Sequence, residues 1–187
     1  DVSGHGLPAA LLMASVRAGL RQRAALGGDL ATIVTDVNRQ FSRDAEISGN
    51  FMTLFCLSID RSGGRLAWVR AGHDPALLYD PHEDRFETLK GEGMALGVDA
   101  EGGYTAATQD GLRDGQVILL GTDGIWEARR TTGEMLGKGP VRELLREQAH
   151  RSAADIVTAL TEHVQTFIGP GRPEDDLTVV VVKVVAS

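Results

Sequence analysis

The sequence predicts an α+β fold in which antiparallel sheets are flanked by helices. Its helical segments occur in pairs between groups of strands, and the strands follow one another closely enough to form hairpins. A doubly wound parallel sheet would instead alternate single strands with single helices. The chain has 187 residues, contains no internal repeat and has no linker long enough to divide it. We therefore expect a single domain, or most of one.

Two helices are expected near the start of the chain. In the run from Leu7 to about Leu26, Leu12, Val16 and Leu20 recur at helical spacing, and a pair of glycines ends the run. Asp29 can then cap a second helix. The apolar stripe of this second helix consists of Leu30, Ile33, Val34, Val37 and Phe41.

Two further helices are expected in the last third. A shorter amphipathic segment runs from Val141 to about Gln148. Ser152, with Asp155 three residues later, is typical of a capping box. The helix that it opens carries an apolar stripe and is stopped by Gly169-Pro170. That stripe consists of Ile156, Leu160, Val164 and Phe167.

The expected strands are short and rich in apolar or β-branched residues. The first, Phe51–Ile59, is apolar on both alternating faces, which is typical of a strand buried from both sides. Arg61–Gly64 has the composition of a hairpin turn into the next strand. The remaining strand candidates are Arg65–Ala71, Ala76–Tyr79, Phe86–Leu89, Gln116–Leu120 and Leu177–Val185.

Composition excludes several classes of function. A single cysteine excludes a disulfide framework and a multi-cysteine metal site. The net charge of −7 argues against a surface that binds the backbone of a nucleic acid. No apolar run reaches the roughly 18 residues needed to span a bilayer, and no signal-peptide pattern is present, so we expect a soluble segment without a membrane partner.

The first residues form a loop-like string rather than the beginning of a domain. The chain opens with Asp1-Val2-Ser3-Gly4-His5-Gly6 and has no initiator methionine. Natural domains rarely begin on a segment so rich in chemically active residues. We therefore expect that an earlier part of the domain is missing from this sequence.

Acidic residues stand where expected strands meet loops. Asp1 precedes the first helix, Asp123 follows an apolar strand, and Asp175-Asp176 stands directly before the final strand. The last two sites adjoin very apolar strands, so we expect them near a sheet end and partly desolvated. Converging carboxylates repel one another unless a cation lies between them, and Mg²⁺ or Mn²⁺ prefers such oxygen ligands. Ordinary turn chemistry explains each aspartate equally well, so spacing alone leaves both interpretations open.

Other chemically active residues give weaker indications. His5 lies between two glycines, where backbone freedom could bring it near a ligand, although a loop histidine without function fits as well. His73 is typical of a turn residue whose ring braces the loop. Cys56 is expected to be an inert residue of a buried strand. Ser3 has no evident base partner, so a catalytic triad is poorly supported.

An ordered set of motifs resembles the SpoIIE/RsbU-type branch of the metal-dependent (PPM, type 2C) serine/threonine protein phosphatases. The resemblance covers nearly the whole chain, and the motifs occur in the family's order and spacing. They are DVSGHG (1–6) leading into AALLM (9–13), FMTLF (51–55), AGHDPALLY (71–79), LGV (96–98), GTDGIWEA (121–128) and DDLTVV (175–180).

The resemblance implies a sandwich of two packed antiparallel sheets with helices on both outer faces and two Mn²⁺ or Mg²⁺ ions at one end. Asp1 would bridge both ions, and the backbone carbonyl of Val2 would bind one of them. Asp123 and Asp175 would hold the other ion, whereas Asp176 would shape the site without binding directly. His5 lies near the place where relatives carry a proton donor. A hydroxide formed between the two ions would attack phosphorus without a covalent phosphoenzyme.

The sequence also departs from the family's pattern. The family's first segment, which supplies another metal-site carboxylate, and the strand that leads into Asp1 are both absent. Asp74 follows His73 where relatives often have asparagine, a change that a turn should tolerate. None of the ligand positions that are present is substituted, which argues against a degenerate pseudophosphatase.

By resemblance, the chain is identified as a bacterial, cytoplasmic phosphatase domain at residues 1–187, without its N-terminal segment. Its substrate would be a phosphoserine or phosphothreonine of a protein that antagonises an anti-sigma factor. An upstream sensor or receiver domain and a homodimer are also compatible with this family. Two alternatives remain open: a partner-binding module without catalysis, and a phosphoesterase that acts on small molecules.

Overall fold

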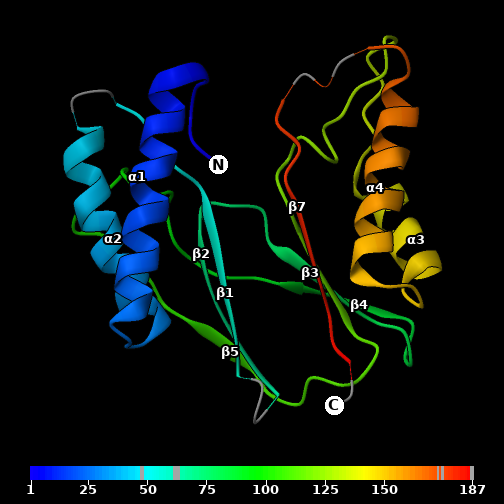
Figure 1. Ribbon diagram of the computed structural model, residues 1–187, viewed down its shortest axis with the longest axis horizontal. Helices are drawn as coiled ribbons and strands as arrows, with labels where there is room; N and C mark the ends of the chain where they lie inside the picture. Colours follow the sequence, from blue (N-terminus) through cyan, green and yellow to red (C-terminus); the bar gives the residue numbers. More distant parts are fainter. Residues whose placement is uncertain (47–48, 61–63, 172, 174, 186–187) are drawn as a thin grey trace. The chain divides into compact units, whose positions relative to one another are not determined.

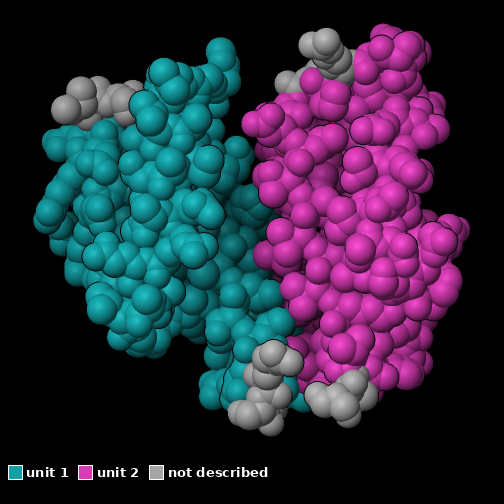
Figure 2. Space-filling model, in the orientation of Figure 1, with its two compact units in different colours: residues 1–75, 90–111 teal, residues 76–89, 112–187 magenta. Residues whose placement is uncertain are grey.

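The fold is described by a computed structural model covering residues 1–46, 49–60, 64–171, 173 and 175–185. The chain forms two compact units (Figure 2). Unit 1 contains residues 1–75 and 90–111, and unit 2 contains residues 76–89 and 112–187. The expected turn at Arg61–Gly64 falls mainly on residues 61–63, which lie outside the described part of the chain.

Unit 1 consists of two helices and a three-stranded antiparallel sheet (Figure 1). The sheet has the order β1-β2-β5. The elements are α1 (Gly6–Ala25), α2 (Leu30–Ala45), β1 (Leu54–Asp60), β2 (Arg65–Ala71) and β5 (Ala107–Gln109). The register pairs Leu54 with Ala71 and Trp68 with Ala107.

The two helices of unit 1 bury the apolar stripes expected from the sequence. In α2, Val34, Val37 and Phe41 lie in a core cluster with Val69 and other residues of the sheet. In α1, Val16 joins the same cluster, and Leu12 and Leu20 pack against it. The Asp29 carboxylate accepts the backbone N–H of Thr32 at 2.9 Å, which confirms the expected cap of α2.

The first strand differs from its expectation. β1 begins at Leu54 rather than at Phe51, and its side chains are half-buried or exposed rather than buried on both faces. The reason is its position, because β1 lies at an edge of its sheet and pairs only with β2 in the described part of the chain. Cys56 on this strand is half-buried, and burial raises the pKa of its thiol, as expected for an inert residue.

Unit 2 contains a four-stranded antiparallel sheet and two helices. The sheet has the order β4-β3-β6-β7, and β6 pairs with both of its neighbours. The elements are β3 (Ala76–Asp80), β4 (Arg85–Leu89), β6 (Val117–Gly121), α3 (Lys138–Gln148), α4 (Ala153–Ile168) and β7 (Val179–Lys183). The expected α+β class with antiparallel sheets and flanking helices is therefore confirmed.

The helices of unit 2 cover its sheet through one apolar core. Ile156, Leu160 and Val141 are at most 2% exposed and lie in a cluster with Val117 and Leu119 of β6. The capping box is confirmed, since the Asp155 N–H donates to the Ser152 hydroxyl at 3.2 Å and that hydroxyl donates to the Asp155 carboxylate at 2.7 Å.

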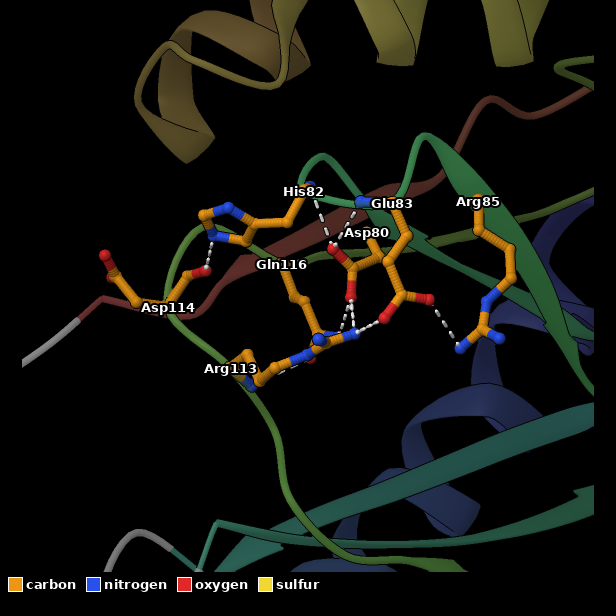
Figure 3. A network of polar contacts seen from close by, with 7 residues as sticks. All are labelled: Asp80, His82, Glu83, Arg85, Arg113, Asp114 and Gln116. Carbon is orange, nitrogen blue, oxygen red and sulfur yellow. Dashed lines mark hydrogen bonds and ion pairs between the residues drawn. The ribbon is translucent and has the colours of Figure 1, made fainter.

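A buried carboxylate fixes one end of the unit 2 sheet (Figure 3). Asp80, at the end of β3, is 3% exposed. It accepts hydrogen bonds from the backbone N–H of His82 at 2.9 Å, from the side-chain amide of Gln116 at 2.8 Å and from the guanidinium of Arg113. The β3–β4 turn is thereby tied to the segment that enters β6. Burial by itself would raise the pKa of Asp80, but the hydrogen bonds outweigh this effect, so its pKa lies below the ordinary value.

Candidate metal centre

Two of the expected ligands lie on neighbouring loops of unit 2. β6 ends at Gly121, which pairs with Val179, the first residue of β7. Because these strands are antiparallel, the loop after β6 and the loop before β7 lie at the same end of the sheet. Asp123 is on the first loop and Asp175 is on the second. The expectation that both lie near a sheet end is thus fulfilled.

Thr122 connects the two loops. Its backbone N–H donates to the carbonyl of Thr178 at 3.1 Å, and its hydroxyl donates to the carbonyl of Asp176 at 3.0 Å. The same hydroxyl accepts the backbone N–H of Thr178 at 3.1 Å. A single side chain therefore uses both its donor and its acceptor capacity to hold together the segments that carry Asp123 and Asp175.

Gly124 permits the close approach of these loops. A Cβ atom at this position would lie 2.6 Å from the backbone carbonyl oxygen of Asp176. A side chain here would therefore have to push a backbone atom away. The turn is also anchored in the core, because Ile125 and Trp126 are 2% and 7% exposed. The position of Asp123 follows from this anchor, and its carbonyl accepts the N–H of Glu127 at 2.8 Å.

The carboxylates of unit 2 were expected to be partly desolvated, and the structure confirms this only for Asp123. Asp123 is half-buried, whereas Asp175 and Asp176 are exposed, so the expected desolvation is wrong for the second loop. The physical reason is that the second loop approaches the sheet through backbone groups: Thr122 contacts the Asp176 carbonyl, not its side chain. The Asp175 carboxylate accepts the N–H of Asp176 at 2.7 Å.

The other expected ligands lie in unit 1, on a short extended segment beside residues 51–53. Asp1 and Thr53 exchange two hydrogen bonds: the Asp1 amino group donates to the Thr53 carbonyl at 2.9 Å, and the Thr53 N–H donates to the Asp1 carbonyl at 2.7 Å. Val2 forms an antiparallel bridge with Met52. The hydrogen bonds of this ladder come from the residues on either side of Val2, so the carbonyl of Val2 points away from Met52. That direction leaves it suitable as a metal ligand.

Ser3 and His5 occupy positions with different roles. The Ser3 hydroxyl accepts the Phe51 N–H at 2.9 Å, and the side-chain amide of Asn50 donates to the Ser3 carbonyl at 2.7 Å. Ser3 is thus a structural residue of the ladder. His5 is exposed at the N-cap of α1 and forms no side-chain cap there.

The set of donor atoms fits hard divalent cations. Asp1, Asp123 and Asp175 supply carboxylate oxygens and Val2 supplies a carbonyl oxygen, the ligand types that Mg²⁺ and Mn²⁺ prefer. Within the ranges that the structure covers, no three or more His, Cys, Asp or Glu side chains gather as a metal cluster. The structure brings together the loops of Asp123 and Asp175 in unit 2, while Asp1 and Val2 belong to unit 1.

Two residues whose hydrogen bonds support segments carrying the expected ligands, each within its own unit, were not predicted from the sequence. Thr122 lies beside Asp123 in the sequence, and Thr53 pairs with Asp1 across the ladder. His73 was expected only to brace its own turn, but its Nδ1 lies 2.8 Å from the Thr53 hydroxyl. A hydroxyl residue directly beside an expected ligand is the one signal that could have identified Thr122. No such signal exists for Thr53.

Comparisons with known proteins agree with the expected family. The family model described as "Stage II sporulation protein E (SpoIIE)" matches residues 1–185. The phosphoserine phosphatase RsbU of Bacillus subtilis (strain 168) is 26% identical over 186 residues, which are 98% of this chain and 53% of RsbU. The chain thus spans about half the length of that relative.

Solved structures show the same fold. The SiaA-PP2C domain of Pseudomonas aeruginosa superimposes with a TM-score of 0.85 at 24% identity, covering 98% of this chain and 73% of that domain. A structure of RsbX in complex with magnesium has a TM-score of 0.69 at 17% identity, covering 97% of this chain and 76% of RsbX. In the part of the chain that the structure describes, no helix is both long and apolar enough to cross a membrane.

Proposed function

Because the chain belongs to the SpoIIE family, we propose that it hydrolyses phosphoserine or phosphothreonine in a protein and that two Mn²⁺ or Mg²⁺ ions serve as its cofactor. The observation that carries the proposal is the pairing of the Asp123 and Asp175 loops through Thr122. The expected enzyme class, a protein serine/threonine phosphatase, agrees with the name of the relative RsbU. The proposed phosphatase domain spans residues 1–187.

Each ligand has a defined support in its own unit. Asp123 and Asp175 would hold one ion from two loops that share the end of one sheet. Asp1 would bridge to a second ion, which the carbonyl of Val2 would also bind, and both residues lie on a ladder that is hydrogen-bonded to residues 51–53. When bound, such ions lower the pKa of a water and neutralise charge on the phosphoryl group. Rigid strand ends suit ligands that must keep a fixed geometry.

The residues also define smaller roles within the proposal. Asp176 would shape the centre through its backbone carbonyl, which accepts the Thr122 hydroxyl. His5 precedes the first turn of α1, close in sequence to Asp1, and is assigned the role of proton donor to the leaving serine or threonine oxygen. The cellular substrate would be a phosphorylated anti-sigma-factor antagonist in the bacterial cytoplasm, presented under the control of an upstream sensor or receiver domain.

The proposal is tested by assaying the full-length protein with Mn²⁺ on a phosphoserine protein and, side by side, on small phosphate esters. Asp123→Asn and Asp175→Asn should lower turnover by more than the roughly 10- to 100-fold that is typical of residues in the outer sphere of a metal. Asp110→Asn is the matched control, because this exposed carboxylate pairs with Arg65 at 3.6 Å and belongs to unit 1, outside the loops of Asp123 and Asp175.

Two outcomes would contradict the proposal. Absence of turnover, or turnover unchanged by Asp123→Asn, would indicate a binding module without catalysis. A clear preference for a small phosphate ester over the phosphoprotein would indicate a phosphoesterase of small molecules.

A further inference from the structure

We propose that Thr53 and His73 are positioning residues for Asp1, an inference that rests on the proposed role of Asp1 as a metal ligand. The Thr53 hydroxyl and His73 Nδ1 lie 2.8 Å apart, within hydrogen-bond distance. Neither residue would bind the metal itself. The hydrogen bond with His73 would instead fix the side chain of Thr53, the cross-strand neighbour of Asp1. A fixed Thr53 would in turn limit the Asp1 carboxylate to one orientation toward the metal ion.

Thr53 is directly opposite Asp1. The two residues exchange both of their backbone hydrogen bonds, at 2.9 and 2.7 Å, which defines a hydrogen-bonded antiparallel pair. Side chains of such a pair project from the same face of the ladder, with Cβ atoms about 4.5–5.5 Å apart. The Thr53 side chain is therefore the cross-strand neighbour of the Asp1 side chain, and what fixes Thr53 would also shape the surroundings of Asp1.

The ladder itself is already fixed from its other side. The Met52 N–H donates to the Leu96 carbonyl at 3.0 Å, and the Leu96 N–H donates to the Met52 carbonyl at 2.8 Å. Met52 and Leu96 are 4% and 0% exposed. With the backbone of residues 51–53 held in this way, the hydrogen bond between the Thr53 hydroxyl and His73 would favour one rotamer of the Thr53 side chain.

His73 is held independently of its ring. The guanidinium of Arg70 donates to the His73 carbonyl and, at 3.1 Å, to the Gly91 carbonyl. The Gly72 N–H donates to the Gly93 carbonyl at 2.9 Å. Gly72 has a φ of +68°, and a Cβ there would lie 2.9 Å from the backbone nitrogen of Ala95, so only glycine fits this turn. The His73 imidazole therefore projects from a turn whose backbone is held by hydrogen bonds, which makes it a suitable hydrogen-bond partner to fix the Thr53 side chain.

The test separates the hydrogen bond from the bulk of the side chains. Thr53→Val keeps the shape and removes the hydroxyl, whereas Thr53→Ser keeps the hydroxyl. Asparagine at position 73 can place a polar atom near the position of Nδ1, whereas glutamine reaches only toward Nε2. His82→Gln is the matched control, because the His82 ring contacts the Asp114 carbonyl at 3.1 Å in unit 2.

The primary readout is the affinity for Mn²⁺, measured by titration calorimetry on the full-length protein. We expect Thr53→Val and His73→Gln to weaken it about 10- to 100-fold, the range typical of outer-sphere partners of metal ligands. Thr53→Ser and His73→Asn should restore most of the loss, and His82→Gln should match the wild type. The Tm of each metal-free variant shows whether its fold is intact, and the conservative pair keeps the test informative if Thr53→Val unfolds.

Several results would overturn the inference. These are a Mn²⁺ affinity unchanged by Thr53→Val, an equal loss in His73→Asn and His73→Gln, and a wild-type protein that binds no Mn²⁺. A wild-type protein that binds Mn²⁺ but hydrolyses no phosphoprotein would refute the proposed function alone. In that case the affinities of the four variants would still decide whether Thr53 and His73 position Asp1.

Discussion

The hydroxyl of Thr122 donates a hydrogen bond at 3.0 Å to the backbone carbonyl of Asp176, 54 residues further along the chain. The bond joins the loop that follows β6 to the loop that precedes β7. The first loop carries Asp123 and the second carries Asp175, the two expected ligands of unit 2. Because the bond uses a backbone acceptor, it fixes the course of the second loop whatever the side chain at position 176.

Removal of the Thr122 hydroxyl should loosen both loops. We expect Thr122→Val to lower the free energy of unfolding by about 0.5–1.5 kcal/mol, the net value of ordinary hydrogen bonds. It should also weaken Mn²⁺ binding, whereas Thr122→Ser should retain both properties. Urea unfolding and calorimetric titration measure the two effects.

A threonine elsewhere in unit 2 provides the control for this experiment. The Thr158 hydroxyl donates to the Ala154 carbonyl at 3.1 Å within α4. Thr158→Val therefore removes a similar bond without touching either loop. Equal Mn²⁺ affinities in Thr122→Val and the wild type would show that this bond does not support the metal centre.

A methyl group at Gly124 should force the same loops apart. The new Cβ would lie 2.6 Å from the Asp176 carbonyl oxygen, so the backbone must shift. We expect Gly124→Ala to destabilise the protein by about 1–3 kcal/mol, as is typical of overpacking. In Gly139→Ala, the new Cβ would have no atom within 4 Å, and alanine should stabilise α3 by up to about 1 kcal/mol. The prediction fails if both variants shift the urea midpoint in the same direction.

Mn²⁺ should raise the Tm in proportion to its binding. A ligand at 100 times its Kd stabilises the folded state by about 2.7 kcal/mol. Asp175→Asn should abolish most of this shift, because it removes a carboxylate that is expected to bind the ion directly. Asp110→Asn should keep the full shift. Thermal unfolding with and without Mn²⁺, followed by EDTA to reverse the effect, provides the measurement.

Because of Asp80, the free energy of unfolding should decrease at acid pH. Its pKa is lowered in the folded protein, so its contribution is fully present above the ordinary carboxyl pKa of 3.8 and is lost as the pH falls through the lower folded value. Asp80→Asn should cost about 1–3 kcal/mol near pH 6, because Gln116 and Arg113 lose a charged acceptor. The difference from the wild type should shrink below about pH 4. Urea unfolding across this range measures it, and a difference independent of pH would contradict the assignment.

The sequence predicts the elements well because their signals are local. The stripe Leu12, Val16 and Leu20 of α1 and the cap Asp29 of α2 each depend on residues within two or three helical turns. β5 escaped detection because its three residues, Ala107–Gln109, are too few to show alternation. The edge position of β1 was equally invisible, since it depends on which strands pair and not on the apolar residues of β1.

The sequence predicted which carboxylates are candidate metal ligands, but it did not predict the residues whose hydrogen bonds support them. Asp123 and Asp175 were expected from their places beside apolar strands, and the pairing of Gly121 with Val179 explains why those places coincide. Thr122 and His73 act through contacts across 54 and 20 residues of chain, respectively. The periodicity of apolar residues along the sequence does not reveal contacts between residues so far apart in the chain. Residue spacing therefore singled out the carboxylates as candidates and missed the hydrogen bonds that join the loops carrying them.

The division of the chain into units has a consequence for how it can be cut and recombined. The hairpin of β3 and β4 lies between stretches of unit 1 in sequence but pairs with β6 of unit 2. Any breakpoint between residues 76 and 111 separates β3 from β6, or β2 from β5, or both. A fragment ending at residue 111 would expose an unpaired apolar edge on β3 and would be prone to aggregate. Shuffling with a homologue would therefore keep β2 with β5 and β3 with β6 only where residues 65–121 stay together, and breakpoints at the ends of that block would still divide β1 from β2 and β6 from β7.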